Sequence, residues 1–264
     1  MAASVRHVHE RDSRPGRGVR ECGAGGSVRS SLMDTGLLLL ALEDFAPVVL
    51  SAAAVWVLSR VCSGLDATAG QYVRASFVLL LIGGLSKPIY KLIFALSDGS
   101  VDLVVLDEAL FWFLAPGFIL LAVGLRSASR VDRGGDPRIE RAWPVAATGV
   151  VIAAAGLLAF GSDAWFIVLL ATTTLANIAV VVVLVRWARA YRDTLTAALF
   201  GATLVIVFGL AWAAASLEQT TATQWGEQLV STVSQGLLLW GSVRLSALVA
   251  GDSTGTASAP IADG

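Results

Sequence analysis

The sequence predicts an all-α membrane protein whose chain crosses the bilayer seven times. Only 15% of its 264 residues are charged and 56% are hydrophobic, whereas soluble domains carry about 25% charged residues. Apolar runs of about 18 or more residues, which are long enough to cross a bilayer, recur along most of the chain. We therefore expect a multi-pass protein of the cell membrane, with the lipid bilayer as its first partner.

Seven apolar runs bounded by charged or turn residues are the predicted spans, each about 17 to 25 residues long. At 1.5 Å per helical residue, that length crosses a hydrocarbon core of about 30 Å. Tryptophan begins three of the runs, where interfacial aromatic anchors commonly lie. In chain order, the predicted spans are Phe45–Val61, Tyr72–Leu96, Leu103–Leu125, Trp143–Phe160, Trp165–Val185, Leu195–Leu217 and Trp225–Val249.

The arginines predict how the spans are oriented. The connections after the first, third and fifth spans, together with the end of the seventh, carry eleven arginines, and the alternate connections carry no Lys or Arg. Because cytoplasmic loops are enriched in Lys and Arg, we expect the N-terminus outside and the C-terminus in the cytoplasm. The eleven are Arg60, Arg74, Arg126, Arg130, Arg133, Arg138, Arg141, Arg186, Arg189, Arg192 and Arg244.

The two ends of the chain differ from the apolar region in composition. Residues 1–32 are rich in Arg, Gly and Ser without periodicity, so we expect a disordered tail. Its six arginines would have to cross the membrane in the predicted orientation. Starting the chain at Met33 removes this conflict and would make residues 1–32 an upstream extension. Residues 33–250 are then the seven-helix domain, and residues 251–264 are a second disordered tail.

A short alignment relates the third predicted span to the seventh. Two parallel repeats of three helices around a middle span, a 3+1+3 plan, would produce such a relation. This layout resembles that of the microbial rhodopsins and the SWEET-type sugar transporters. The seventh span, however, lacks the lysine that holds retinal, and the chain has no Pro-Gln pair. The aligned identities are Glu108 with Glu227, Leu110 with Leu229, Gly117 with Gly236 and Leu120 with Leu239.

The residues that most metal and nucleophilic chemistry requires are scarce. Both histidines, His7 and His9, lie in the N-terminal tail, and the two cysteines, Cys22 and Cys62, are far apart. This argues against a histidine-ligated metal or haem, Ser-His catalysis and a disulfide framework. We expect no cofactor and no metal, and an enzyme is the least favoured class. The net charge of −1 gives no reason to expect a nucleic-acid partner.

The stretch "LSKPIYKL" places Lys87 and Lys91 on one face of the second span. Lys87 is about nine residues, or about 13 Å, from the outer end of the span. Because an ionisable group inside a bilayer costs roughly 2.5 to 3.5 kcal/mol, we expect Lys87 in a buried ion pair, whereas Lys91 can snorkel to the interface. Pro88 clashes with the carbonyl of Gly84 and predicts a kink, which either shapes a site or simply permits close packing.

Carboxylates on the outer side are the expected partners of these lysines. Glu108, near the start of the third span, is the leading candidate, and Asp107 lies about 100° around the same helix. Glu227 opens the seventh span and is either part of the site or a solvated helix start. Gln235 belongs to a polar face of that span that we expect to point inward. We expect Glu43 and Asp44, at the outer end of the first span, to lie at the interface rather than in the site.

Two functions follow from this arrangement. The first is a small transporter or permease-like protein with a polar site between the second, third and seventh spans, in the outer half of the membrane. Its ligand would be small and polar or anionic. The alternative is a seven-helix sensor without its own output domain, which would need a partner protein in the membrane or the cytoplasm.

Overall fold

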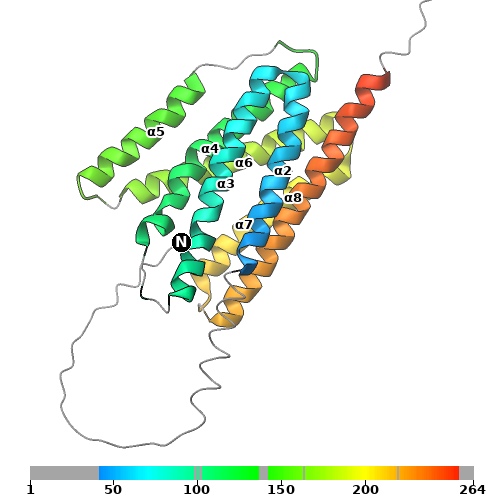
Figure 1. Ribbon diagram of the computed structural model, residues 1–264. Coiled ribbons are helices and arrows are strands. Elements are labelled where there is room, and N and C mark those ends of the chain that lie inside the picture. Colours follow the sequence, from blue (N-terminus) through cyan, green and yellow to red (C-terminus); the bar gives the residue numbers. More distant parts are fainter. Residues whose placement is uncertain are drawn as a thin grey trace, which may run out of the picture.

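The computed structural model describes residues 42–97, 100, 103–136, 142–162, 164–218 and 220–255. These residues form seven α-helices and no strand, packed side by side as Figure 1 shows. The expected tail of residues 1–32 lies outside the described residues. The helices are α2 (Phe45–Leu65), α3 (Ala67–Leu96), α4 (Val104–Val131), α5 (Ala142–Ala159), α6 (Ala164–Ala190), α7 (Thr194–Ser216) and α8 (Thr221–Gly255).

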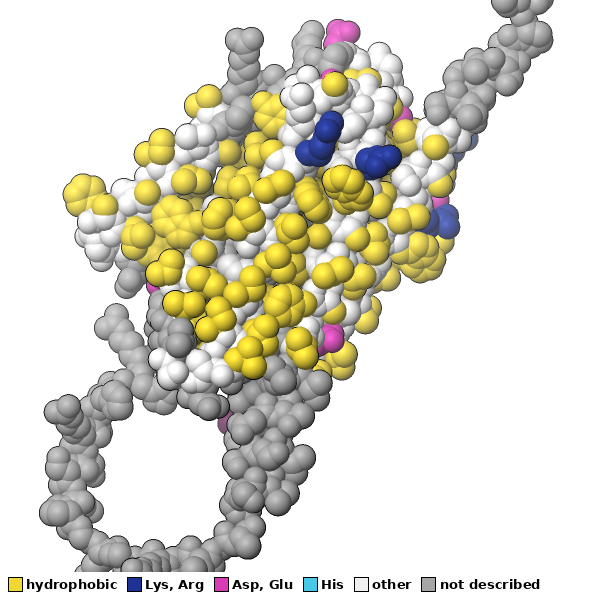
Figure 2. All heavy atoms as spheres, viewed as in Figure 1, with side chains coloured by type: hydrophobic (Ala, Val, Ile, Leu, Met, Phe, Trp, Pro, Cys, Tyr) yellow, Lys and Arg dark blue, Asp and Glu magenta, His cyan; other side chains and the backbone are white. Residues whose placement is uncertain are grey.

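The helices have the length and composition of membrane spans. Six of them, all except α5, are long and apolar enough to cross a bilayer, and α5 contains a shorter apolar segment, Val145–Ala159. Large hydrophobic side chains also lie on the outer surface, including Phe160 (91% exposed) and Val205 (72%). Figure 2 shows hydrophobic side chains covering the middle of one face of the bundle. The predicted all-α, seven-helix membrane class is confirmed.

Most of the helices extend beyond the predicted spans at one end of the bundle. For example, α4 continues from Leu125 to Val131 and α6 from Val185 to Ala190, in both cases through arginines. α8 reaches Gly255, so residues 251–255, at the predicted start of the second tail, are helical. Hydropathy falls where a helix leaves the hydrocarbon, but the backbone hydrogen bonds continue into the interface. Sequence hydropathy therefore ended these spans too early.

Six helices form a ring, and α5 lies outside it. In order around the ring, α2, α3, α4, α6, α7 and α8 each pack against the next, and α8 closes the ring against α2. α5 packs against α4 and α6, at the edge of the bundle in Figure 1. The predicted 3+1+3 repeat gains no packing support, because a Cβ at Gly117 would meet Leu80 at 2.9 Å, whereas nothing lies within 4 Å of Gly236. The repeat stays a prediction.

Helices that follow one another in the chain run in opposite directions, which brings the arginine-bearing segments to one end of the ring. This arginine end holds the ends of α2, α4, α6 and α8 and the starts of α3 and α7. The main hydrophobic core lies here, and its members come from all six ring helices. Its largest fully buried side chains are Trp187, Phe200, Leu58, Leu121, Leu125, Leu184 and Leu245.

Polar side chains tie the helices together at the arginine end. Asp66 accepts hydrogen bonds from the N–H groups of Thr68 and Ala69, both at 3.1 Å, and so caps α3. Asp132, just after α4, accepts hydrogen bonds from Trp187 Nε1 of α6 and from the hydroxyl of Tyr191, just after α6, both at 2.7 Å. Because a buried donor or acceptor without a partner costs free energy, these contacts help to fix the positions of the helix ends.

Asp193 forms a similar joint between α7 and α8. It caps α7 through the N–H of Thr196 at 3.0 Å, and Arg244 of α8 donates to it at 2.8 Å. The N–H of Thr196 first, and then the Arg244 guanidinium, hold the pKa of Asp193 below its ordinary value of 3.8. The carboxylate is therefore charged at neutral pH and holds the two helices together.

Candidate functional site

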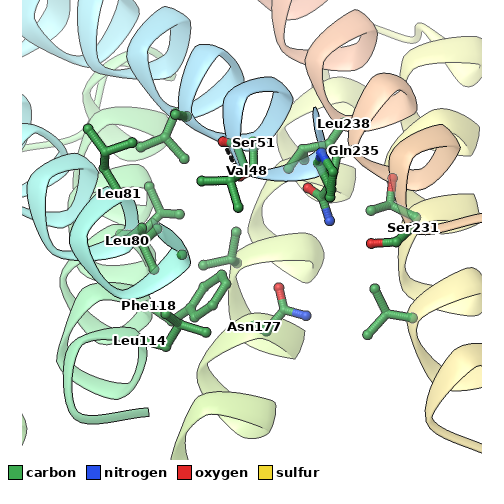
Figure 3. A pocket seen from close by; sticks show the side chains of 18 of the residues that line it. Val48, Ser51, Leu80, Leu81, Leu114, Phe118, Asn177, Ser231, Gln235 and Leu238 are labelled. Atoms are coloured by element: carbon green, nitrogen blue, oxygen red, sulfur yellow. Dashed lines mark hydrogen bonds between the residues drawn. The ribbon is translucent and has the colours of Figure 1, made fainter. Parts of the chain in front are cut away.

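A cavity of about 420 Å³ lies inside the ring, in the half of the bundle opposite the arginine end. Figure 3 shows side chains from several helices pointing into it. The part of its lining farthest from the arginine end comes from the start of α2, the later turns of α3 and the first turns of α8. Its floor is formed by Leu58, Leu121 and Leu184, which are at most 2% exposed and belong to the core of the arginine end. The cavity therefore ends where the packed core begins.

Neutral polar groups line the cavity at middle depth. Asn177 comes from α6, and Gln228, Ser231 and Gln235 follow one another on a face of α8. Figure 3 shows Asn177, Ser231 and Gln235 around the same space. None of these four side chains forms a hydrogen bond with another described residue. Their donors and acceptors are thus available to water or to a ligand.

An ion pair lies at the edge of the cavity that is farthest from the arginine end. Lys91 Nζ is 2.5 Å from Asp44 Oδ2, and Asp44 is only 6% exposed. The second carboxylate oxygen of Asp44 is buried and has no hydrogen-bond partner among the described residues. Glu43 accepts a hydrogen bond from Thr232 of α8 at 3.0 Å. The two acids just before α2 therefore connect the start of α2 to α3 and α8. The sequence had predicted an interfacial position for them rather than a place in the site.

Lys87 lines the same cavity, one helical turn closer to the arginine end than Lys91, and its side chain is exposed. The predicted ion pair between Lys87 and Glu108 does not form. Among the described residues the two ion pairs are Lys91–Asp44 and Arg244–Asp193.

The geometry of α4 explains why that prediction was wrong. Leu110, Leu114, Phe118 and Leu121 form the face of α4 that borders the cavity. Glu108 precedes Leu110 by two residues, which places it about 160° from Leu110 around the helix, and its side chain is exposed. Sequence depth alone placed Glu108 near Lys87, because the face that α4 turns inward was not known.

The remaining predicted residues are divided between the cavity wall and other positions. Gly84, Pro88 and Gln235 line the cavity. Glu227 is half-buried on α8 and does not border the cavity, and the Asp107 side chain lies outside the described part of the chain.

The predicted kink lies within a continuous helix. α3 runs unbroken from Ala67 to Leu96 with Pro88 inside it. A Cβ added at Gly84 would meet Val48 of α2 at 3.0 Å. Gly84 therefore serves the close packing of α2 on α3, beside the cavity.

The cavity belongs to a seven-helix membrane protein and carries cationic and neutral polar groups. No group of three or more His, Cys, Asp or Glu side chains that could hold a metal ion lies among the described residues. Comparisons of the chain with protein-family models, with curated proteins and with solved structures give no match.

Proposed function

We propose that this protein is a small transporter whose cavity binds an organic anion that also carries hydrogen-bonding groups. The observation that supports the proposal best is the cavity itself, which two lysine and three amide side chains line. Its volume of about 420 Å³ falls in the range of about 300 to 1,000 Å³ found for small-molecule sites. Such sites are mostly apolar with a few polar groups that orient the ligand.

The charges favour an anion. Lys87 and Lys91 contribute two positive charges and Asp44 one negative charge, so the cavity carries a net positive charge of one. The Lys91 amine already donates to Asp44, which leaves the Lys87 amine to meet a carboxylate or a similar group. Charge-assisted hydrogen bonds of this kind are about twice as strong as neutral ones.

The neutral side chains favour a ligand with hydroxyl or amide groups. Asn177, Gln228 and Gln235 each offer both donors and acceptors. Below them, the apolar floor would contact the carbon skeleton. A hydroxylated carboxylate of modest size combines these features.

Transport would require a second state in which the arginine end opens. In the predicted orientation, the packed core at that end separates the cavity from the cytoplasm. Alternating access commonly uses rigid-body movement of helix groups around a site at middle depth. The Lys91–Asp44 ion pair joins α2 to α3, and its rearrangement would accompany such a movement.

The closed floor also favours the alternative, a sensor that binds the same ligand without moving it. A sensor needs a cavity that stays closed toward the cytoplasm and a partner protein that reads its occupied state. The two functions share the ligand site and differ in whether the ligand crosses the membrane.

Ligand binding can be tested with matched pairs of small molecules. Purified protein is heated with gluconate, glucuronate or lactate, and separately with glucose or glycerol as neutral counterparts. We expect at least one anion, and no neutral compound, to raise the melting temperature in a concentration-dependent manner. Lys87→Met should lower the affinity for that anion about tenfold or more, because a hydrogen bond to a charged group contributes about 1.5 to 3 kcal/mol.

Arg60→Met is the matched control, because Arg60 is an exposed cation away from the cavity. If no anion of the set binds, or if both variants weaken binding equally, the anion site is wrong. Uptake of the bound anion into proteoliposomes then separates the two functions. Uptake that Lys87→Met abolishes supports the transporter, and binding without uptake contradicts it in favour of the sensor.

A further inference from the structure

A second concave surface lies outside the ring, between α4, α5 and α6. This lateral groove has a volume of about 430 Å³ and is lined by Ile119, Ala122, Val123, Arg126, Arg130, Ala146, Val150, Thr172, Leu175, Ala176, Ala179 and Val183. It shares no lining residue with the central cavity.

The position of α5 explains why the groove exists. Toward the opposite half, Ala154 of α5 packs with Ala115 of α4 and with Trp165 and Leu169 of α6 in a small core. The earlier residues of α5 that face the groove, Ala146 and Val150, come from its first turns. The small core holds the later turns of α5 against α4 and α6, and its first turns form one wall of the groove.

The chemistry of the groove changes along its length. Arg126 and Arg130 lie one turn apart on α4, and neither forms an ion pair with a described carboxylate. Apart from these two guanidinium groups and the Thr172 hydroxyl, the lining side chains are aliphatic. Thr172 donates its hydroxyl to the carbonyl of Val168 at 2.7 Å, so it adds little free polarity. The groove is thus cationic at one end and apolar along the rest of its length.

The dimensions correspond to one leaflet of a bilayer. From Arg130 to Ile119 the groove follows α4 for eleven residues, about 16 Å at 1.5 Å per residue. Half of a hydrocarbon core of about 30 Å is about 15 Å. With Arg130 at the level of the phosphate groups of one leaflet, the aliphatic wall would therefore extend along most of the acyl chains of that leaflet.

We propose that the lateral groove is a binding site for an anionic phospholipid of the leaflet at the arginine end. Its phosphate group lies between Arg126 and Arg130, and one acyl chain lies along α4 and α6 toward Ile119. Basic pockets between membrane helices on the cytoplasmic side are suited to anionic lipid headgroups. The guanidinium fork matches phosphate oxygens in a bidentate manner. This site shares no lining residue with the central cavity, so it does not depend on the function proposed for that cavity.

Lipid binding is measured on the full chain in a neutral detergent. Phosphatidylglycerol and phosphatidylcholine with identical acyl chains are added in equal amounts, and bound lipid is counted by native mass spectrometry. We expect wild-type protein to retain phosphatidylglycerol preferentially. The double variant Arg126→Gln/Arg130→Gln should lower this retention about 30-fold, to the level of phosphatidylcholine.

Two further variants make the test specific. Arg186→Gln/Arg189→Gln removes two exposed arginines of α6 that lie at the arginine end of the bundle but do not line the groove. This variant should retain phosphatidylglycerol as wild type does. Ala179→Trp keeps both groove arginines and fills the apolar wall, so it should lose the lipid. Inorganic phosphate should not displace bound phosphatidylglycerol, because the acyl chain contributes to binding.

Three results would overturn the proposal. Equal loss in the two double variants would mean that any arginine at this end attracts the lipid. Wild-type retention by Ala179→Trp would mean that the groove holds no chain. Displacement by inorganic phosphate at the lipid concentration would mean that the arginines bind a free anion.

Discussion

The two halves of the helical ring use their inward-facing side chains in different ways. At the arginine end, Trp187 and Phe200 are fully buried, and hydrogen bonds such as Trp187 to Asp132 cross from helix to helix. In the opposite half, the centre of the ring is a cavity of about 420 Å³ bordered by amides, hydroxyls and two lysines. Packing in this second half continues only outside the cavity, for example where Trp112 stacks on Trp165 with ring centroids 5.5 Å apart.

The contrast shows how a bundle in lipid can hold an open site. Lipid tails are as apolar as the helices, so the association of membrane helices depends on van der Waals packing and hydrogen bonds. Concentrating both at the arginine end fixes the helix directions there. The opposite half then needs fewer contacts, and small or polar side chains such as Ser51 and Ser231 can leave space between the helices.

The largest expected difference between the halves comes from truncating one leucine in each. Leu125 is fully buried and does not border the cavity, so Leu125→Ala should lower the free energy of unfolding by about 2 to 5 kcal/mol, because a void remains in the packed core. Leu81 borders the existing cavity, so Leu81→Ala should cost less than about 1.5 kcal/mol. Thermal unfolding in detergent measures both. Equal losses would contradict the difference in packing.

Alanine in place of glycine should have opposite effects in two helices. A Cβ at Gly124 would lie 2.6 Å from Val73 Cγ2 and 3.0 Å from the carbonyl oxygen of Ala69. Gly124→Ala should therefore destabilise the protein by about 1 to 3 kcal/mol. Gly236 has nothing within 4 Å, so Gly236→Ala should stabilise α8 by about 0.5 to 1 kcal/mol. The melting temperatures should move in opposite directions, and a shared direction would contradict this account.

The smallest expected effect concerns pH at the arginine end. The folded-state pKa of Asp193 lies below 3.8 because of Thr196 and Arg244. Its stabilising contribution is therefore present above that ordinary value and is lost as pH falls through the lower folded value. The difference in melting temperature between wild type and Asp193→Asn should narrow as pH falls below about 4. A difference that stays the same over this range would contradict the stabilising role of the Asp193 carboxylate.

The helices could be predicted from the sequence because their signal is local. Each of the seven apolar runs corresponds to one helix, since a span needs only length and hydropathy. The faces of the helices could not be predicted in the same way. Whether α4 turns Glu108 or Leu110 toward Lys87 depends on the rotation of α4 against α3, and this rotation is fixed by packing at positions such as Gly83 and Gly117.

The candidate site was predicted in part. Lys87, Lys91 and Gln235 stood out because charged and amide groups are costly in lipid, and all three line the cavity. The role of Asp44 was missed, because it is 47 residues from Lys91 in the chain. Only the closure of the ring by α2 and α8 brings the start of α2 beside the later turns of α3.

Thiol labelling tests the contrast between the two halves most directly. The native Cys62 is buried in the core of the arginine end, and Ser231 borders the cavity. In a Cys22→Ser background, membranes whose two faces are both open to a small charged methanethiosulfonate are labelled with and without Ser231→Cys. We predict that the introduced thiol reacts readily and that Cys62 stays unmodified until the protein unfolds. Rapid modification of Cys62, or an unreactive thiol at position 231, would contradict the account of a closed arginine end and a water-filled cavity in the opposite half.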